Sequence, residues 1–415
     1  MYEFFDQIIF KIGNVIIAVL TWLISLFATP PAWLPAVVWF VFKVVLIIAT
    51  FPAIFAMTTW AERKILGRIQ NRLGPNRVGP VGLFQPIADG IKTLTKEDIV
   101  PAIADKPIHT MAPVIAVVAS FLVIAVLPIG RNMIGADLNI GVLFFFAAGS
   151  ISEVSIFMAG WASRNKYSLL GGMRAIAQMV SYEIPFILSA VTVVMVVGSL
   201  STSQIVSAQQ LHLLVEDPEG LGDLLKRVVF HFYNNIGGWF VFQPWGFFGF
   251  VIFFTSSLAE LNRSPFDLPE AESEIIAGHH TEYSGFKFAL FALSEYISMI
   301  AVCGLASTLF LGGWNGPHLL PSWGWFFLKV FSLMFVMIWI RGTFPRLRAD
   351  QLMGFAWKFL LPLSLINIFS AGLWYHIPSR AFGWLASALI MGGAYHFLSR
   401  GVVTRDIEKR IYRFA

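Results

Sequence analysis

Charged residues and cysteine are both scarce in this chain of 415 residues. Only 13% of the residues are charged, whereas soluble proteins average about 25%. The chain therefore lacks the polar surface that a soluble fold of this length needs to cover its core. The single cysteine, Cys303, excludes an internal disulfide and a cysteine-ligated zinc site or iron–sulfur cluster on this chain alone.

Hydrophobic residues make up 57% of the chain, and its mean hydropathy is +0.72. Apolar runs long enough to cross a bilayer are continuous, whereas a membrane β-barrel would show short alternating segments. The sequence therefore predicts an all-α, polytopic transmembrane helix bundle. The apolar runs are 8–28, 36–60, 112–130, 140–162, 176–200, 245–262, 287–311, 323–341, 358–376 and 382–398.

The first apolar run has two interpretations. Its N-terminal flank carries Glu3 and Asp6 against Lys11, so the flank is acidic and unlike that of a signal peptide, and residues 26–28 form a poor cleavage site. We expect a retained transmembrane helix. An interfacial or cleaved segment is the alternative.

Lysine and arginine are distributed unevenly between the loops. Residues 61–111 contain eight of them. Most of the others lie in every second loop, that is, in the loops on the same side of the membrane as residues 61–111. By the positive-inside rule this side is cytoplasmic, and both termini face it if the first and last runs span. The net charge of +5 follows from this bias, so nucleic-acid binding is not expected.

The first cytoplasmic loop contains a turn and then an amphipathic stretch. In the turn, Gly74 and Gly79 have phosphate-loop spacing, but Pro80 and Val81 replace the residues that would bind phosphate and magnesium. Beyond it, apolar residues recur at helical spacing and predict a helix lying in the membrane interface. The apolar face either packs on a soluble partner or forms the rim for a lipid-soluble ligand. It consists of Phe84, Ile87, Ala88, Ile91 and Leu94.

A second cytoplasmic loop is rich in carboxylates. Pro265 and Pro269 stiffen it, and Phe266 makes it partly apolar, while Arg263 is its only strong base. Crowded carboxylates near a membrane raise one another's pKa and can hold or pass protons as a coupled set. A solvated acidic loop is the alternative. The carboxylates are Glu260, Asp267, Glu270, Glu272, Glu274 and Glu282.

Ionisable residues also occur within the apolar runs, where they are costly and usually functional. We expect Glu153, Glu183 and Glu295 to face a shared polar core, whereas an ion pair with Lys329 is the structural alternative. His279 and His280 do not predict a metal site, because adjacent residues point apart on a helix. Further polar residues in these runs are Lys43, Arg341 and the series Arg174, Gln178 and Tyr182.

Long motifs in this sequence resemble those of a known family. They are Glu62–Lys64 through Gly79–Pro80, residues 82–89 (GLFQPIAD), 175–185 (AIAQMVSYEIP), 260–285 (ELNRSPFDLPEAESEIIAGHHTEYSG) and 346–353 (RLRADQLM). Together they are similar to the H subunits of the proton-pumping NADH:quinone oxidoreductase, respiratory complex I, over about residues 36–376.

The resemblance implies a core of eight helices over residues 34–376, with an extra helix in 1–33 and an extra helix and basic tail in 377–415. It implies a quinone tunnel shared with the hydrophilic arm, near Glu62, Arg63, Phe84, Ile87, Arg263 and Phe266. The family's proton path maps onto Glu183, Asp267, Glu270, Glu272, Glu274 and Glu282; we add Glu153, Glu260 and Glu295 from their position in or at the end of apolar runs.

The resemblance also implies which partners and cofactors to expect. No cofactor is expected on this chain; quinone is the substrate, and FMN and iron–sulfur clusters belong to partner subunits. The other partners are lipid and the remaining membrane and hydrophilic subunits, in a bacterial inner membrane. Two further functions remain open, namely the membrane anchor of an energy-converting hydrogenase, which uses no quinone, and a secondary transporter, although the inverted repeats typical of transporters are not found.

Overall fold

The computed structural model describes residues 7–25, 34–210, 238–269, 276–317, 320–377 and 379–403. The long helices are α2 (Ile8–Ser25), α3 (Leu34–Ile69), α5 (Lys106–Ala125), α6 (Gly141–Ala162), α7 (Lys166–Val197), α10 (Pro244–Glu260), α12 (Gly285–Phe310), α13 (Ser322–Thr343), α15 (Leu361–His376) and α16 (Arg380–Val403). The shorter elements are η1 (Pro80–Gly82), α4 (Gln85–Thr95), β1 (Pro128–Gly130), β2 (Met133–Ile134), α8 (Thr202–Ala208), η3 (Phe240–Phe242), η4 (Gly278–His280), α14 (Ala349–Phe355) and η5 (Ala356–Leu360).

The predicted all-α membrane bundle is confirmed. Among the described residues, eight helical segments are long and apolar enough to cross a membrane: α3, α5, α6, α7, α12, α13, the continuous stretch from α14 to α15, and most of α16. Helix α10 lies in the bundle with 17 residues, somewhat fewer than the ~20 of a typical span. The hairpin of β1 and β2 is a small addition that the apolar pattern did not predict.

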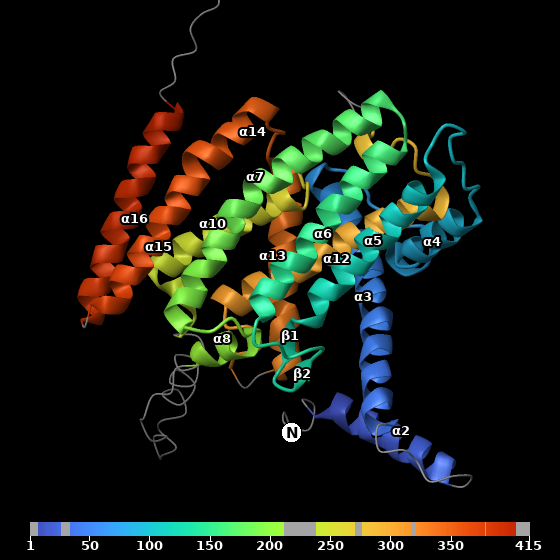
Figure 1. Cartoon of the computed structure of the whole chain (residues 1–415), viewed down its shortest axis with the longest axis horizontal. Helices are drawn as coiled ribbons and strands as arrows, with labels where there is room; N and C mark the ends of the chain where they lie inside the picture. The colour runs from blue at the N-terminus through green and yellow to red at the C-terminus, as the bar shows by residue number, and fades with distance from the viewer. Residues whose placement is uncertain are drawn as a thin grey trace, which may run out of the picture.

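The helices differ in how deeply they lie in the bundle. Over half of the apolar window of α12 is buried, whereas only 6% of that of α3 and 17% of that of α16 are. Figure 1 shows α3 and α16 at opposite flanks, with α12 between them. The polar groups carried by α12 therefore lie at the centre of the molecule.

Helix α2 runs across one end of α3, at the end away from α4 (Figure 1). It contacts α3 through the ring of Phe10, which lies edge-on to Trp39 at 5.4 Å between centroids. A helix is therefore present in the first apolar run, but its apolar stretch, Phe10–Val19, is not among the spanning candidates. Its crossing of the membrane stays a prediction, as do the limits of the three expected regions.

Small residues bring the polar loop after α10 against the bundle. A Cβ added at Gly171 of α7 would lie 2.5 Å from the Cα of Gly278, so only glycine permits this approach of η4 to α7. Gly160 of α6 and Gly172 of α7 also lie side by side, although a Cβ on either would be about 3.4–3.5 Å from the Cα of the other. These contacts place η4 beside α6, α7 and α12, where the functional site is found.

Candidate functional site

A buried ion network joins α3 to the loop after α10 and to α13. Glu62 of α3 is 3% exposed, and Nη1 of Arg263 lies 3.0 Å and 3.1 Å from its two carboxylate oxygens. Arg341 donates a further hydrogen bond to Glu62, and the Tyr296 hydroxyl donates another at 2.6 Å. Glu62 is thus a carboxylate held by two cations and a phenol.

Arg263 extends this network towards α12. Its Nε lies 2.8 Å from Oε1 of Glu295, and its guanidinium stacks 4.3 Å above the ring of Tyr296. Burial lowers the pKa of Arg263, but the charges of Glu295 and Glu62 outweigh burial and raise the pKa above its ordinary value. Arg263 therefore stays a cation at 5% exposure, because two carboxylates neutralise it.

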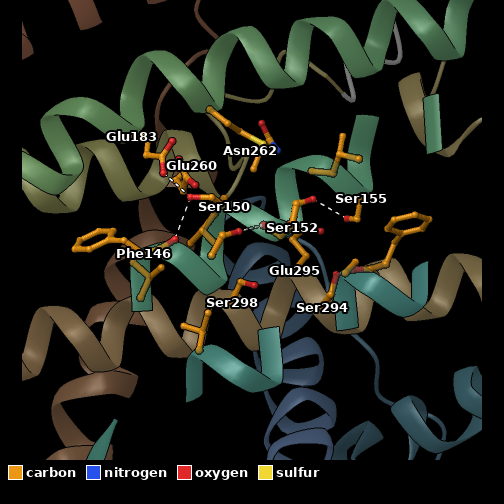
Figure 2. Close-up of a pocket in the computed structure, with 18 of the residues that line it drawn as sticks. Phe146, Ser150, Ser152, Ser155, Glu183, Glu260, Asn262, Ser294, Glu295 and Ser298 are labelled. Carbon is orange, nitrogen blue, oxygen red and sulfur yellow. Dashed lines mark hydrogen bonds between the residues drawn. The ribbon is translucent and has the colours of Figure 1, made fainter. Parts of the chain in front are cut away.

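Glu295 also borders a cavity of about 100 Å³ between α6, α7, α10 and α12. Figure 2 shows Glu183 and Glu260 grouped at one part of this cavity, and Glu295 with Ser294 and Ser298 at another. A cavity of this size, with several polar groups among largely apolar walls, has room for water. Its other polar lining residues are Ser150, Ser152, Ser155, Asn262, His279 and His280.

One carboxyl group at the cavity accepts a hydrogen bond from a serine of α6. Ser150 donates a hydrogen bond of 2.6 Å to Glu183, and Glu153 of α6 is buried at 7% exposure. The structure thus places Glu183, Glu260 and Glu295 at one cavity, whereas Glu153, which the sequence grouped with Glu183 and Glu295, is not among the residues that line it.

Two neighbouring polar residues of α7 hold loops in place instead of facing the cavity. The Gln178 amide donates to the carbonyls of Ala259 at 2.7 Å and Phe266 at 2.6 Å. The Tyr182 hydroxyl donates to the Leu352 carbonyl at 2.8 Å. These bonds fix the segment that carries Arg263 and the start of the stretch that leads into α15.

The histidine pair is arranged differently from what the sequence predicts. His279 and His280 do not point apart; their rings lie 3.8 Å apart, and both residues line the cavity. Both belong to the 3-10 turn η4, and both rings pack edge-on against Phe291 of α12. Within the described ranges, no group of three or more His, Cys, Asp or Glu residues is placed to hold a metal ion.

Lys329 does not form the ion pair that was the structural alternative for the carboxylates. Its ammonium donates to the carbonyls of Leu311, Gly313 and Asn315 at 2.6–2.8 Å and lies 4.1 Å from the ring of Trp239. It therefore satisfies carbonyls just beyond the end of α12. Among the described residues it makes no salt bridge, so Glu153, Glu183 and Glu295 are not explained as its partners.

The amphipathic helix expected after the turn is present as α4. Phe84 and Ile87 are 50% and 58% exposed, and Ile91 and Leu94 are exposed beside them. On the other side of α4, Asp89 accepts a bond of 2.5 Å from Arg63 of α3. Burial raises the pKa of Asp89, but the hydrogen bond and charge of Arg63 outweigh burial and lower it below its ordinary value.

The remaining predicted residues lie around this centre. Asp267 pairs with Arg346 at 3.0 Å, and Glu282 accepts a bond of 2.6 Å from Asn165 at the start of α7. Phe266 is 5% exposed, 5.5 Å from the ring of Tyr182, and does not line the cavity. Glu270, Glu272 and Glu274 lie outside the described residues.

Sequence reasoning did not select Tyr296, Ser150 or Arg341 as site residues. Arg341 was recognisable as a cation within an apolar run. Its pairing with Glu62 could not be predicted, because the two residues are far apart in the sequence. Tyr296 follows Glu295 directly, and no periodicity separates it from ordinary core tyrosines. Ser150 is one of several serines in α6, and only its contact with Glu183 identifies it.

Comparisons with known proteins agree with the motifs. The model of the NADH dehydrogenase family matches residues 42–372. The H subunit of NADH-quinone oxidoreductase from Dehalococcoides mccartyi (strain CBDB1) is 51% identical over 309 residues, which are 74% of this chain and 79% of that protein. Its counterpart from Bacillus thuringiensis (strain Al Hakam) is 45% identical over 357 residues, 84% of this chain and 97% of its own. The chain therefore belongs to the NADH dehydrogenase family, among the H subunits of NADH-quinone oxidoreductase, respiratory complex I.

Proposed function

We propose that this chain forms the quinone entrance and part of the quinone cavity of its complex, together with the hydrophilic arm, and that it couples quinone reduction to proton translocation. Electrons arrive from FMN and iron–sulfur clusters on partner subunits. This chain supplies the apolar rim for the quinone tail, the charged residues near the headgroup and the carboxyl groups that relay protons. The names of its relatives favour this function over a hydrogenase anchor.

The exposed face of α4 supports the quinone entrance. Phe84, Ile87, Ile91 and Leu94 present apolar side chains outward, while the Arg63–Asp89 pair holds the helix against α3. A quinone with a long apolar tail partitions into the bilayer and needs an apolar surface at the membrane interface. Glu62 and Arg263 lie behind this entrance, and Phe266 supports the loop that carries Arg263.

One observation carries the coupling proposal. Glu295 contacts Arg263 of the ion network and also lines the cavity with Glu183 and Glu260. A charge change at Glu62 or Arg263, on the quinone side, therefore alters the field felt by carboxyl groups on the cavity side. In this proposal protonation of Glu295 weakens its pair with Arg263, and the proton passes through the polar cavity to the other carboxyls.

The acidic loop is the proposed continuation of this path. Asp267 and Glu282 are tied to Arg346 and Asn165 at its two described ends. Glu270, Glu272 and Glu274 complete it in this proposal, as the family resemblance implies.

We infer that the side of the bundle bearing α4 is cytoplasmic in a bacterial inner membrane. In Figure 1 the connection from α6 to α7, the start of α14 and the described end of α16 lie on the same upper side as α4. The basic loops are attached to these ends, which agrees with the positive-inside rule.

The test replaces Glu295 by Gln in the complete complex. Two activities are measured, NADH oxidation with a quinone and NADH oxidation with a water-soluble artificial acceptor, together with proton uptake into vesicles. We expect quinone-linked turnover and pumping to fall together by about tenfold or more, while the artificial-acceptor activity stays unchanged because electron entrance is remote from Glu295.

The matched control is Glu97→Gln, which removes an exposed carboxylate from the loop after α4. It should leave all three measurements unchanged. Pumping and quinone turnover at the wild-type level in an assembled Glu295→Gln complex would contradict the proposed coupling.

A further inference from the structure

A second cavity, of about 290 Å³, lies at the end of α3 that is remote from the ion network. Its walls come from α2, α3, α5, the β1–β2 hairpin and α13, which meet at the lower side of Figure 1. The cavity is partly open to the outside, and an apolar recess of this size takes up apolar ligands in preference to water. The main lining residues are Phe10, Trp39, Ile47, Phe51, Ile124 and Phe327.

A single cation borders this apolar space. The ammonium of Lys43 donates to the carbonyls of Ile134 and Gly135 at 3.3 Å and 3.2 Å, which occupies two of its three N–H groups. In the part of the chain that the structure describes, Lys43 makes no salt bridge. An anion at this place would therefore meet an ammonium that is already oriented by the hairpin.

The cavity runs from the level of the helix ends into the bundle. Trp39 lies near the start of α3 and Trp323 near the start of α13, and tryptophan is enriched at the level of the lipid headgroups. Phe51 lies about 18 Å further along α3 at 1.5 Å per residue. The walls there are apolar apart from Thr50, whose hydroxyl donates to the Leu46 carbonyl of its own helix. The polar and apolar parts of the cavity therefore follow the order of headgroup and acyl chain in a lipid.

We propose that this cavity binds one anionic phospholipid. Its acyl chain lies between Ile47, Phe51 and Phe327, and its phosphate accepts a hydrogen bond from Lys43. The charge favours this occupant over a long-tailed quinone, because a quinone headgroup is neutral and gains less from an ammonium. The bound lipid would fill the space between α2, α3 and α13 and fix α2 to the bundle, independently of quinone chemistry.

The experiment uses the intact complex in nanodiscs of phosphatidylcholine and a phosphatidylglycerol with a photoreactive group on its acyl chain. Crosslinked peptides are identified by mass spectrometry, and labelling of residues 39–51 and 323–327 is followed against probe concentration. We expect saturable labelling in the wild type. Lys43→Gln should weaken the apparent affinity for phosphatidylglycerol about fivefold, as expected for one lysine at a lipid surface. The same variant should weaken the affinity for a phosphatidylcholine probe less, because the choline partly neutralises the phosphate of that lipid.

Filling the cavity is the second arm of the test. Ile47→Trp should abolish labelling by occupying the acyl site, whereas Val45→Trp, on the exposed side of the same helix, should retain it. Arg131→Gln removes an exposed cation that does not line the cavity and should have no effect. Unchanged labelling in Ile47→Trp, equal labelling by both lipid probes, or displacement of phosphatidylglycerol by equimolar long-tailed quinone would overturn the proposal.

Discussion

The guanidinium of Arg263 lies 3.0 Å from the carboxylate of Glu62, although 201 residues separate them in the chain. Arg341, 279 residues from Glu62, contacts the same carboxylate. Charges buried to this extent are tolerated only when they neutralise one another. The pairing therefore ties α3, the loop after α10 and α13 into one unit, and any change in one charge is felt by the others.

Replacing Arg263 by Gln should destabilise the protein. Glu62 and Glu295 would each lose a partner, and breaking a buried pair on one side costs about 3–5 kcal/mol of unfolding free energy. The measurement is the melting temperature and yield of the assembled complex. Arg263→Lys keeps the charge but cannot reach Glu62 and Glu295 with a planar guanidinium, so it should lose less unfolding free energy than Arg263→Gln. The double variant Arg263→Gln with Glu62→Gln should lose less unfolding free energy than the sum of the two single variants. Strict additivity of these losses would argue that the contact is energetically unimportant.

Glu183→Gln should keep assembly but impair proton transfer. The amide has the shape of the carboxyl and still accepts the bond from Ser150, yet it cannot ionise. We expect quinone-linked turnover and pumping to fall by about tenfold or more. Glu183→Asp, which retains an ionisable group, should keep more of both. Wild-type rates in an assembled Glu183→Gln complex would remove this residue from the path.

The docking of α4 on α3 should depend on pH through Asp89. The pKa of Asp89 is lowered in the folded state, so its pairing with Arg63 stabilises above the unfolded pKa of about 3.9 and is lost as pH falls through the lower folded pKa. The contribution is about 0.2–1 kcal/mol, because half of the Arg63 side chain is exposed.

Hydrogen exchange of the α4 amides measures this contribution. Protection should be constant near neutral pH and decrease below about pH 4. Asp89→Asn should show reduced protection throughout and no such pH step, whereas Glu97→Gln should behave as the wild type. A step of the same size in Asp89→Asn would assign the pH dependence to another group.

Ile87→Asp should hinder long-tailed quinones more than short, water-soluble analogues. Ile87 is 58% exposed on the apolar face of α4, and a carboxylate there would repel an apolar tail. The expected result is a rise in KM for the long-tailed quinone, with little change for the short one. Ile87→Leu preserves the apolar surface and should be neutral. Equal effects on both quinones would mean that this face packs against protein.

Helix α16 should contribute stability and not chemistry. Met391 is fully buried against Ile252 and Leu363, whereas Leu389, two residues away, is 75% exposed. Met391→Ala should cost about 2–5 kcal/mol of unfolding free energy and lower the melting temperature, while Leu389→Ala should not. Turnover per intact complex should be unchanged in both. A stable Met391→Ala complex that turns over without pumping would instead place α16 in the coupling machinery.

The sequence alone determined the fold class and most of the participants of the site. Long apolar runs have no stable alternative to membrane helices, so nearly all spans followed from composition. Carboxylates within such runs are costly enough to mark function, and this reasoning selected Glu153, Glu183 and Glu295. The amphipathic period of α4 likewise predicted its exposed apolar face, because helical geometry fixes which residues share a side.

Only the tertiary structure decided how these residues are connected. The pairing of Glu62 with Arg263 and Arg341 depends on the packing of three distant segments, and no local period encodes it. The close approach of the His279 and His280 rings depends on how η4 packs against α7 and Phe291 of α12, and the carbonyl contacts of Lys329 depend on how the chain turns after α12. The orientation of helix α2 was also not encoded locally. An apolar run specifies burial in a low-dielectric environment but not whether the helix crosses the membrane or lies across another helix. Local chemistry thus selected the residues, while long-range packing determined their partners.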